Sequence, residues 1–275
     1  MLPSRYLVCV DPNGAAFGSM NVKHEKAFIP AALEIWPMTG RVADRFASLE
    51  KSINLFSSMR GINRYPGLLE VFDLLAAGFP GNPEVPDATD LRTFVLSETT
   101  YSSASLRRWV AAHPSKELEK VLAWSDRADE LYAKAVEGLA PYPMVRESLE
   151  KASRSAAVAI VSGGAPDELS RDWASSGLEP YIDLMFSQED GAPAAQLYKA
   201  RQSCGGNPSV LMIGDTESDG AAAHKVGALF YPILPGDEAA SWQRFHDTIL
   251  PPFLEGRYDR ETEEKYYSEL KKILA

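Results

Sequence analysis

Four short runs of apolar residues stand near the start of the chain and in its second half, and each ends abruptly at a polar residue, a glycine or a proline. None of them alternates apolar with polar positions, so each predicts a strand buried on both faces, as in a parallel sheet. The four runs are Tyr6–Val10, Ala156–Val161, Val210–Ile213 and Ala228–Tyr231.

Helical segments precede and separate the later runs, and the tail after residue 237 favours two further amphipathic helices. Prolines near the starts and glycines just past the ends of such segments are the usual signals of helix boundaries. The alternation of buried strands with helices predicts an α/β fold with a doubly wound parallel sheet. The predicted helices between the runs are Met144–Ser153, Pro166–Ser176, Ala194–Ser203 and Ser218–Val226.

The segment between the first two strands differs from the rest, because it contains no clear buried-strand run. Its apolar residues favour helices, which are interrupted by polar, proline or glycine positions. We therefore expect a core domain of residues 1–20 and 140–275, with a helical domain of residues 21–139 inserted into it. The helices predicted in the insertion are Ala31–Trp36, Val42–Phe56, Pro66–Ala77, Ser105–Ala112 and Ser115–Leu139.

The charge and the apolar composition of the chain exclude two classes of binding partner. The 275 residues include 28 Lys and Arg against 38 Asp and Glu, which gives a net charge of −10. A nucleic-acid-binding protein would present a basic face, so we expect no nucleic-acid partner. No apolar run approaches the roughly 18 residues that a transmembrane helix needs, so we expect no membrane partner either.

Two features of the sequence favour a cytoplasmic protein. The apolar run before Asp11 is too short for the core of a signal peptide. Only two cysteines are present, Cys9 and Cys204, which is too few for a disulfide framework and is typical of a reducing compartment.

Polar residues follow three of the predicted strands at the point where each strand ends. Asp11 follows the first, Ser162 and two glycines follow the second, and Asp215 follows the third, with Asp219 four residues later. Ligands of a doubly wound sheet bind outside the carboxyl ends of the strands, so these side chains are candidates for one site. Each also fits a plainer role taken alone, as a strand-end cap, a helix N-cap or an acidic residue in the first turn of a helix.

Two carboxylates brought together at adjacent strand ends repel each other unless a cation lies between them. Mg²⁺ suits a site of oxygen ligands that combines one or two carboxylates with the phosphate of a substrate. The hydroxyl of Ser162 and the backbone N–H groups of Gly163 and Gly164 would bind phosphate oxygens at a helix N-terminus. The pattern therefore indicates a magnesium site beside a phosphate site.

The order and spacing of these residues resemble the haloacid dehalogenase (HAD) superfamily, which four short motifs define. The first motif, a strand followed by Asp-x-Asp-Gly-Thr, corresponds to Asp11-Pro12-Asn13-Gly14-Ala15, in which Asn13 stands in place of the second Asp and Ala15 in place of the Thr. The second, a strand that ends in Ser or Thr, is matched by Val161-Ser162-Gly163, and the fourth, Gly-Asp-x-x-x-Asp, by residues 214–219. The inserted helical domain resembles the cap of the superfamily's cap-bearing members, and the core resembles its Rossmannoid core.

The resemblance implies a role for each matched residue. Asp11 is then a catalytic nucleophile, which takes a phosphoryl group as an aspartyl-phosphate. Ser162 and Gly163 bind the phosphate of a small phosphorylated molecule. The metal site implied is one for Mg²⁺, and its residues are Asp11, Asn13 through its backbone carbonyl, Asp215 and, in support, Asp219.

Two departures from the superfamily pattern lower the expected rate. Asn13 stands in the catalytic position where phosphatases carry an Asp that protonates the leaving group, and such catalysis typically contributes about 10²–10⁴-fold. The third motif, a Lys at the start of a helix, is expected near Pro193, and Lys199 lies almost two helical turns further on. Arg60 and Arg64, in a loop of the insertion, could supply the missing charge to the phosphate or belong to a solvated loop.

Two functions fit this pattern. The first is a magnesium-dependent HAD-type hydrolase, a phosphatase that works through an aspartyl-phosphate and is slowed by the missing acid and Lys. The second is a catalytically degenerate HAD-like domain that binds a phosphorylated ligand or a protein partner. The retained aspartates at positions 11, 215 and 219 favour the first function, and the two missing residues favour the second.

Overall fold

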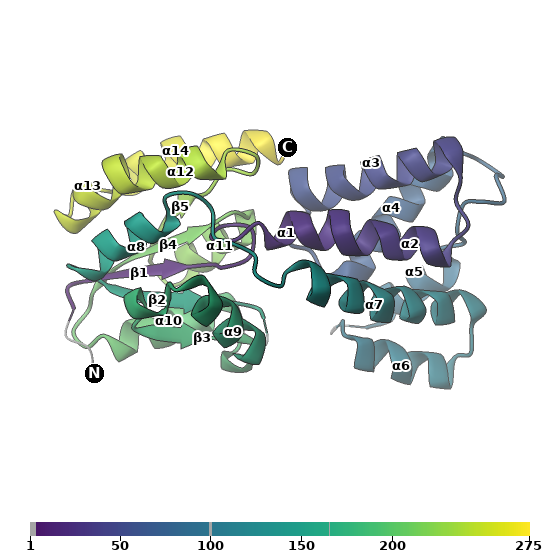
Figure 1. The fold of residues 1–275 in the computed structure, drawn as a ribbon, viewed down its shortest axis with the longest axis horizontal. Helices are drawn as coiled ribbons and strands as arrows, with labels where there is room; N and C mark the ends of the chain where they lie inside the picture. Colours follow the sequence, from purple (N-terminus) through teal and green to yellow (C-terminus); the bar gives the residue numbers. More distant parts are fainter. Residues whose placement is uncertain (1–3, 99–100, 165) are drawn as a thin grey trace. The chain divides into compact units, whose positions relative to one another are not determined.

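The chain forms two compact units in the structure, a computed structural model (Figure 1). The first, called here the α/β unit, comprises Met1–Ser19 and Gly138–Ala275, and the second, called the helical unit, comprises Met20–Glu137. The residues that the structure describes are 4–98, 101–164 and 166–275.

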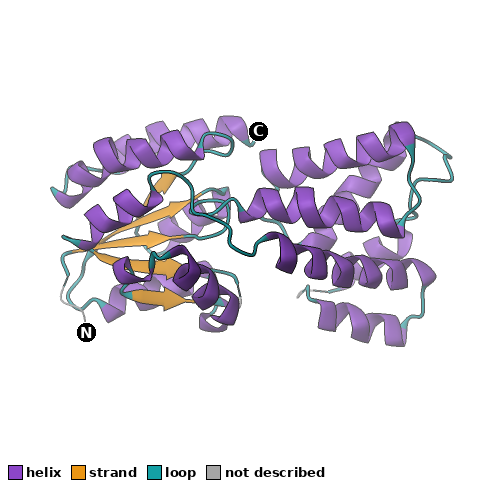
Figure 2. Ribbon diagram, viewed as in Figure 1, coloured by secondary structure: helices purple, strands orange, loops and turns teal. Residues whose placement is uncertain are grey.

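The α/β unit is built on a sheet of five parallel strands in the order β3-β2-β1-β4-β5. Figure 2 draws these strands in orange. The first strand lies in the centre and pairs with β2 on one side and with β4 on the other. The predicted α/β fold, a doubly wound parallel sheet with helices inserted between its first two strands, is confirmed. The strands are β1 (Tyr6–Val10), β2 (Ala157–Val161), β3 (Leu184–Phe186), β4 (Ser209–Gly214) and β5 (Leu229–Pro232).

The central strand is buried along its whole length, as its uninterrupted apolar sequence predicts. Because successive side chains of a strand point to opposite faces, Val8 and Val10 pack in one hydrophobic cluster and Leu7 and Cys9 in another. Both clusters are completed by the helices that cover the two faces of the sheet. These helices are α8 (Val145–Ser153), α9 (Pro166–Ser176), α10 (Pro193–Ser203), α11 (Glu217–Lys225), α12 (Glu238–Arg244), α13 (Leu250–Leu254) and α14 (Arg260–Ile273).

The edge strand β3 is absent from the sequence prediction. It has three residues, all half-buried, and only β2 pairs with it. An edge strand is covered less than a central one, so its sequence carries a weaker apolar signal. The Asp183 carboxylate helps to fix this edge, because it accepts a hydrogen bond from the backbone N–H of Val158 at 2.9 Å.

The tail forms the two helical segments predicted for it, although the first is not a simple helix. A π-helical stretch, Phe245–Ile249, joins α12 to α13. The second segment, α14, is held against the sheet by the buried Glu263, whose carboxylate accepts the backbone N–H of Phe230 in β5 at 3.0 Å.

The helical unit contains no strand among its described residues. Its first helix is longer than predicted, because Ser19–Ile35 runs without a break through α1, a π-helical stretch and α2. A further helix, α5, was not expected. The helices of the unit are α1 (Ser19–Val22), α2 (Ile29–Ile35), α3 (Gly40–Phe56), α4 (Arg64–Gly78), α5 (Thr89–Ser97), α6 (Ser103–Ala112) and α7 (Lys116–Ala135).

The helical unit has a hydrophobic core of its own, rich in aromatic side chains. Trp124 of α7 packs edge-on against Phe28, with ring centroids 5.1 Å apart, and its indole N–H donates to the Phe28 carbonyl at 3.1 Å. Trp36 packs edge-on against Phe72 of α4 in the same core. These buried rings connect the first helix of the unit to α4 and α7.

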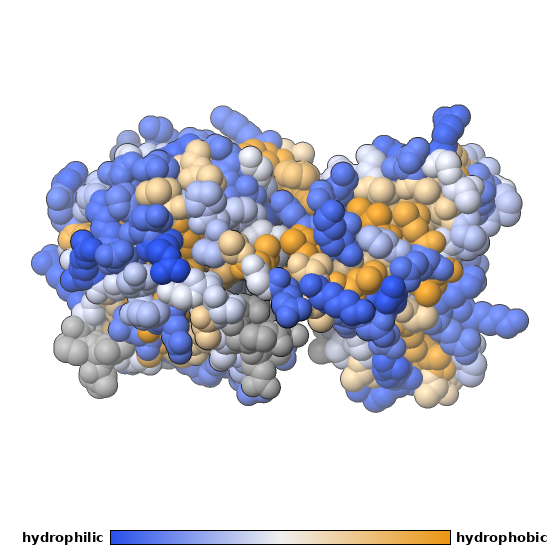
Figure 3. All heavy atoms as spheres, in the orientation of Figure 1, coloured by the Kyte–Doolittle hydropathy of each residue, from blue (hydrophilic) through white to orange (hydrophobic). Residues whose placement is uncertain are grey.

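Hydrophilic side chains cover much of the face drawn in Figure 3, with smaller groups of hydrophobic side chains between them. Among the described residues, none of the helices has the length and apolar character needed to cross a membrane. Both cysteines are free and buried.

Candidate functional site

The order of the strands places two carboxyl ends side by side. The chain passes from β1 to β2 and β3 on one side of the sheet and then returns to β4 on the other side of β1. Such a reversal creates a crevice at the carboxyl ends of the two strands that flank it. Asp11 follows β1 and Asp215 follows β4, and the backbone N–H of Asp11 donates to the carbonyl of Ile213 at 2.9 Å.

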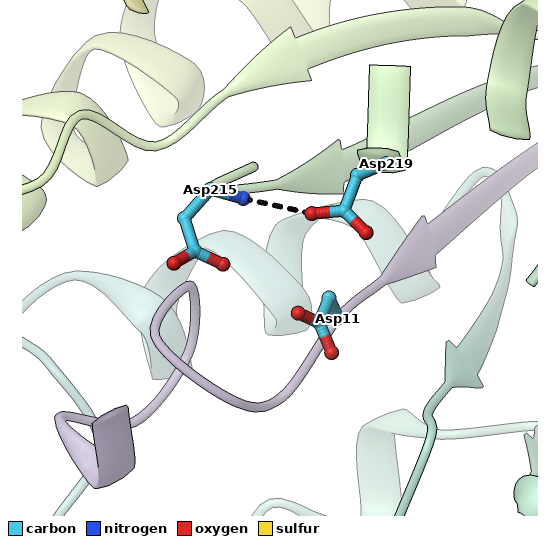
Figure 4. A group of neighbouring side chains, drawn as sticks. All are labelled: Asp11, Asp215 and Asp219. Carbon is cyan, nitrogen blue, oxygen red and sulfur yellow. Dashed lines mark hydrogen bonds between the residues drawn. The ribbon is translucent and has the colours of Figure 1, made fainter. Parts of the chain in front are cut away.

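Three carboxylates meet at this point, as Figure 4 shows. Asp11, Asp215 and Asp219 each offer an oxygen atom, and these atoms all lie within 4.8 Å of one another. Asp215 is fully buried, Asp219 is nearly so, and Asp11 is half-buried. The arrangement therefore concentrates negative charge where little water is available to screen it.

The position of Asp219 is fixed by the first turn of α11. Its Oδ2 atom accepts hydrogen bonds from the backbone N–H of Asp215 at 3.2 Å and of Thr216 at 3.1 Å, and from the Thr216 hydroxyl at 2.7 Å. The Thr216 hydroxyl in turn accepts the backbone N–H of Asp219, which completes a capping box. One oxygen of Asp219 thus holds the turn that follows β4.

The electrostatics of the cluster favour a bound cation. Burial and the nearby Asp215 carboxylate raise the pKa of Asp219 to about 7, although its hydrogen bonds to Thr216 act in the opposite direction. A divalent cation would compensate these charges, and a donor set of carboxylate oxygens suits a hard ion such as Mg²⁺. The three aspartates can therefore hold a metal ion.

The loop after β1 is closed by its own side chains. Asn13 accepts a hydrogen bond from the Ser19 hydroxyl through its side-chain oxygen at 2.9 Å, and its backbone N–H lies 3.4 Å from Asp11 Oδ1. Gly14 has a φ of 88°, which a residue with a side chain rarely adopts. The Asn13 amide therefore has a place in the loop structure, and it carries no proton that it can donate as an acid.

The end of β2 carries the predicted phosphate-binding residues. Ser162 is 1% exposed, and its Oγ atom accepts the backbone N–H of Gly164 at 3.0 Å. Gly163 is exposed, and no atom lies within 4 Å of the position that a Cβ would occupy there. Ser162 therefore shapes the turn, and the open space at Gly163 allows a ligand to approach the backbone closely.

A residue that the sequence analysis missed, Gln196 of α10, contacts this turn. Its side-chain amide is fully buried and bonds to the backbone of Ser162 on both sides of the residue. The sequence offers one weak signal for Gln196. It lies one residue before Leu197 and four before Ala200, both of which are core residues, so helical spacing places its polar side chain beside the buried face of α10.

The cation expected at the start of α10 is absent from that position. Ala192 and Pro193 occupy the start of the helix, and Lys199 forms an exposed ion pair with Asp190 at 3.2 Å. Lys199 is thus engaged at the surface of the unit.

The two arginines predicted to bind phosphate belong to the helical unit and have partners within it. Arg60 is 4% exposed and donates to the Leu55 carbonyl at 2.7 Å. Arg64 pairs with Asp129 at 2.7 Å and donates to the Ser125 hydroxyl at 3.0 Å. Arg60 lies in the turn after α3 and Arg64 is the first residue of α4, and both side chains are held within their own unit.

Comparison with known proteins identifies the family. A family model of haloacid dehalogenase-like hydrolases matches residues 30–227, which is more than half of the chain. A solved haloacid dehalogenase-like protein of unknown function from Agrobacterium tumefaciens has a TM-score of 0.56 and 14% identity, with 91% of this chain and 97% of that chain covered. A proposed beta-phosphoglucomutase from Thermotoga maritima has a TM-score of 0.51 and 18% identity, with 83% and 85% covered. No match was found among the curated proteins.

The match to the family model includes the turns after β2 and β4 and begins after Asp11. The two solved structures, at their low sequence identities, support the same fold and carry no information about a substrate. The parallel sheet with its helical insertion, the cluster of three carboxylates and the match to the family model agree with one another. The chain therefore belongs to the haloacid dehalogenase-like hydrolases.

Proposed function

We propose that the chain is a magnesium-dependent phosphatase that acts on a small phosphorylated molecule through an aspartyl-phosphate on Asp11. The observation that carries this proposal is the cluster of Asp11, Asp215 and Asp219, whose oxygen atoms lie within 4.8 Å of one another. Such a cluster at the carboxyl ends of a doubly wound sheet suits a cation and a phosphate better than a neutral ligand.

The magnesium ligands in this proposal are the carboxylates of Asp11 and Asp215 and the backbone carbonyl of Asn13, with Asp219 in support. When bound, the ion supplies positive charge that reduces the repulsion between the carboxylates and the phosphate oxygens of a substrate. Asp219 suits a supporting role at the magnesium site better than nucleophilic attack on a phosphate, because its Oδ2 atom already accepts three hydrogen bonds.

Asp11 is the proposed nucleophile. One of its carboxylate oxygens attacks phosphorus, so that an O–P bond forms while the bond from phosphorus to the ester oxygen breaks. The ester oxygen keeps the electron pair of the broken bond. Water then attacks the phosphorus of the aspartyl-phosphate, which releases inorganic phosphate and restores the Asp11 carboxylate. Because Asn13 cannot protonate the leaving oxygen, esters of acidic alcohols or phenols react best.

The proposed phosphate contacts are the Ser162 hydroxyl and the backbone N–H of Gly163. Arg60 and Arg64 of the helical unit are the candidates for the missing positive charge. A guanidinium group suits this role, since it donates two parallel hydrogen bonds to phosphate oxygens.

A second candidate function is a domain that binds a phosphorylated ligand or a protein partner without turnover. Two observations favour it. Asn13 replaces the catalytic acid and bonds to Ser19, and the start of α10 carries Ala192 and Pro193 instead of a Lys.

Hydrolysis of para-nitrophenyl phosphate tests the proposed function. We expect slow turnover that needs Mg²⁺, stops when a chelator removes the ion and is abolished by Asp11→Asn. The control is Asp44→Asn, which changes an exposed carboxylate of α3 and is expected to leave the rate unchanged. Turnover that survives Asp11→Asn would contradict the proposed nucleophile, and phosphate binding without any turnover would favour the second function.

A further inference from the structure

The side-chain amide of Gln196 joins three segments of backbone beside the candidate phosphate site. Its Oε1 atom accepts the backbone N–H of Ser162 at 2.9 Å. Its Nε2 atom lies 2.9 Å from the carbonyl of Ser162, 2.8 Å from that of Ser187 and 2.8 Å from that of Gly191. The ends of β2 and β3 and the turn before α10 are thus all bonded to one buried side chain.

These bonds matter because the amide is fully buried. A buried polar group that loses its partners costs free energy, so the amide and the backbone groups around it hold one another in place. The two hydrogens of Nε2 are shared among three carbonyls, and Oε1 serves one donor. A shorter amide would not reach, and a carboxylate would place an acceptor against the three carbonyl oxygens.

The turn that Gln196 holds is the one that presents the phosphate contacts. Both backbone polar groups of Ser162 bond to Gln196, so the amide determines the direction of the peptide planes around Ser162. The Ser162 hydroxyl then accepts the N–H of Gly164, which continues the turn through Gly163. Gly191, which precedes α10, also contributes to this arrangement. Its φ of 100° is a conformation that favours glycine, and its carbonyl accepts a hydrogen bond from the Gln196 amide.

We propose that Gln196 is a positioning residue, which orients the Ser162–Gly164 turn so that it binds the phosphate group of the substrate. This inference rests on the proposed function, since it assigns to Gln196 the support of that phosphate site. Gln196 touches the backbone of the turn and acts on the ligand only through it. Gln196 lies on α10, the helix whose start lacks the Lys of the superfamily pattern. In this proposal α10 therefore supports the phosphate site through a neutral amide and not through a positive charge.

The test compares Gln196→Met with Leu197→Ala in the full chain. Methionine keeps the volume of the side chain and removes all of its hydrogen bonds. Leu197→Ala is the matched control, because Leu197 is 1% exposed on the same helix and packs in the hydrophobic core, and its apolar side chain forms no hydrogen bond with the turn. Two readouts are needed: amide hydrogen exchange at Ser162–Gly164, and the affinity for inorganic phosphate with Mg²⁺ by calorimetry.

We expect Gln196→Met to speed exchange at Ser162–Gly164 and to weaken phosphate binding about 10- to 100-fold, as loss of an orienting residue commonly does. Leu197→Ala is expected to lower the stability of the chain while both readouts stay close to the wild type. If Gln196→Met does not fold, Gln196→Asn takes its place with the same expectation, because the shorter amide stays neutral and polar but does not reach the three carbonyls.

Three outcomes would overturn the inference. Unchanged exchange in the Gln196 variant would show that the amide does not hold the turn. Faster exchange with unchanged phosphate affinity would show a merely structural role, while the proposed phosphate site would stand. A wild-type chain that binds no phosphate would contradict the proposed function and the role of Gln196 together.

Discussion

Asn13 has two sets of contacts that bear on different properties of the chain. Its side-chain oxygen accepts the Ser19 hydroxyl and so closes the loop after β1, and its backbone carbonyl is a proposed magnesium ligand. An aspartate could accept the same hydrogen bond from Ser19, so the loop does not require an amide. The loss of an acid at this position therefore concerns chemistry more than folding.

We predict that Asn13→Asp raises hydrolysis of alkyl phosphates more than that of para-nitrophenyl phosphate. The alkyl leaving group needs a proton and the aryl one does not, so the alkyl rate gains up to the roughly 10²–10⁴-fold that a positioned acid contributes. Steady-state rates on both esters measure this, with Asp11→Asn added as the inactive control. An equal gain on both esters would argue against an acid role for position 13.

Single residues of the site differ in how far the sequence reveals them. Asp11, Ser162 and Asp215 each follow a buried apolar run directly, so their placement at strand ends could be predicted from the sequence. Gln196 could not, because a glutamine on a helix is usually exposed, and its three carbonyl partners lie on segments that only the folded chain brings together.

At the scale of elements, the junction of β4 with α11 fixes the carboxylate cluster. A Cβ at Gly214 would lie 2.5 Å from Asp219 Oδ2 and 2.6 Å from Asp219 Cβ, which is too close for either side chain. Since Asp219 Cβ is attached directly to the backbone of α11, the helix itself would have to move. Gly214 thus permits the close approach of the helix to the strand.

We predict that Gly214→Ala destabilises the chain by about 1–3 kcal/mol, as overpacking usually does, and also weakens magnesium binding. Gly163→Ala is the matched control, because no atom lies within 4 Å of its Cβ position. Urea unfolding and calorimetry with Mg²⁺ measure the two effects. The explanation fails if Gly214→Ala and Gly163→Ala have the same stability and the same magnesium affinity.

Strands and helices could be predicted from the sequence where a clear pattern of apolar residues marked them. The central strands are continuous apolar runs and were found, whereas β3 is a three-residue edge strand with half-buried side chains and was not. The first helix was found only from Ala31 onward, because its earlier part carries the polar run from Lys23 to Lys26. Burial of His24 in that run, at 4% exposure, depends on tertiary packing that the sequence pattern does not show.

At the scale of the whole molecule, the chain has separate hydrophobic cores in its two units. The core of the helical unit draws its buried residues from the segment between Ala27 and Ala128. The clusters on the two faces of the sheet draw theirs from the remainder of the chain. A segment of this size with its own core is typical of a domain that folds by itself.

We therefore predict that residues 20–137, produced alone, fold cooperatively and are mainly helical. Circular dichroism measures the helix content, and urea unfolding measures the cooperativity. The control is Phe94→Ala in the same segment, which removes a fully buried ring and should lower the free energy of unfolding by about 3–5 kcal/mol. A gradual, non-cooperative transition in the unmodified segment would show that the helical unit depends on the rest of the chain.

The central claim is that the carboxylates of Asp11, Asp215 and Asp219 form a magnesium site. Calorimetric titration of the full chain with Mg²⁺ tests it most directly, with Asp215→Asn as the variant and Asp44→Asn as the control for an exposed carboxylate outside the cluster. We predict that the wild type and Asp44→Asn bind Mg²⁺ alike, and that Asp215→Asn binds at least tenfold more weakly because it removes a charged ligand. Equal binding by all three chains would contradict the account and place the site elsewhere.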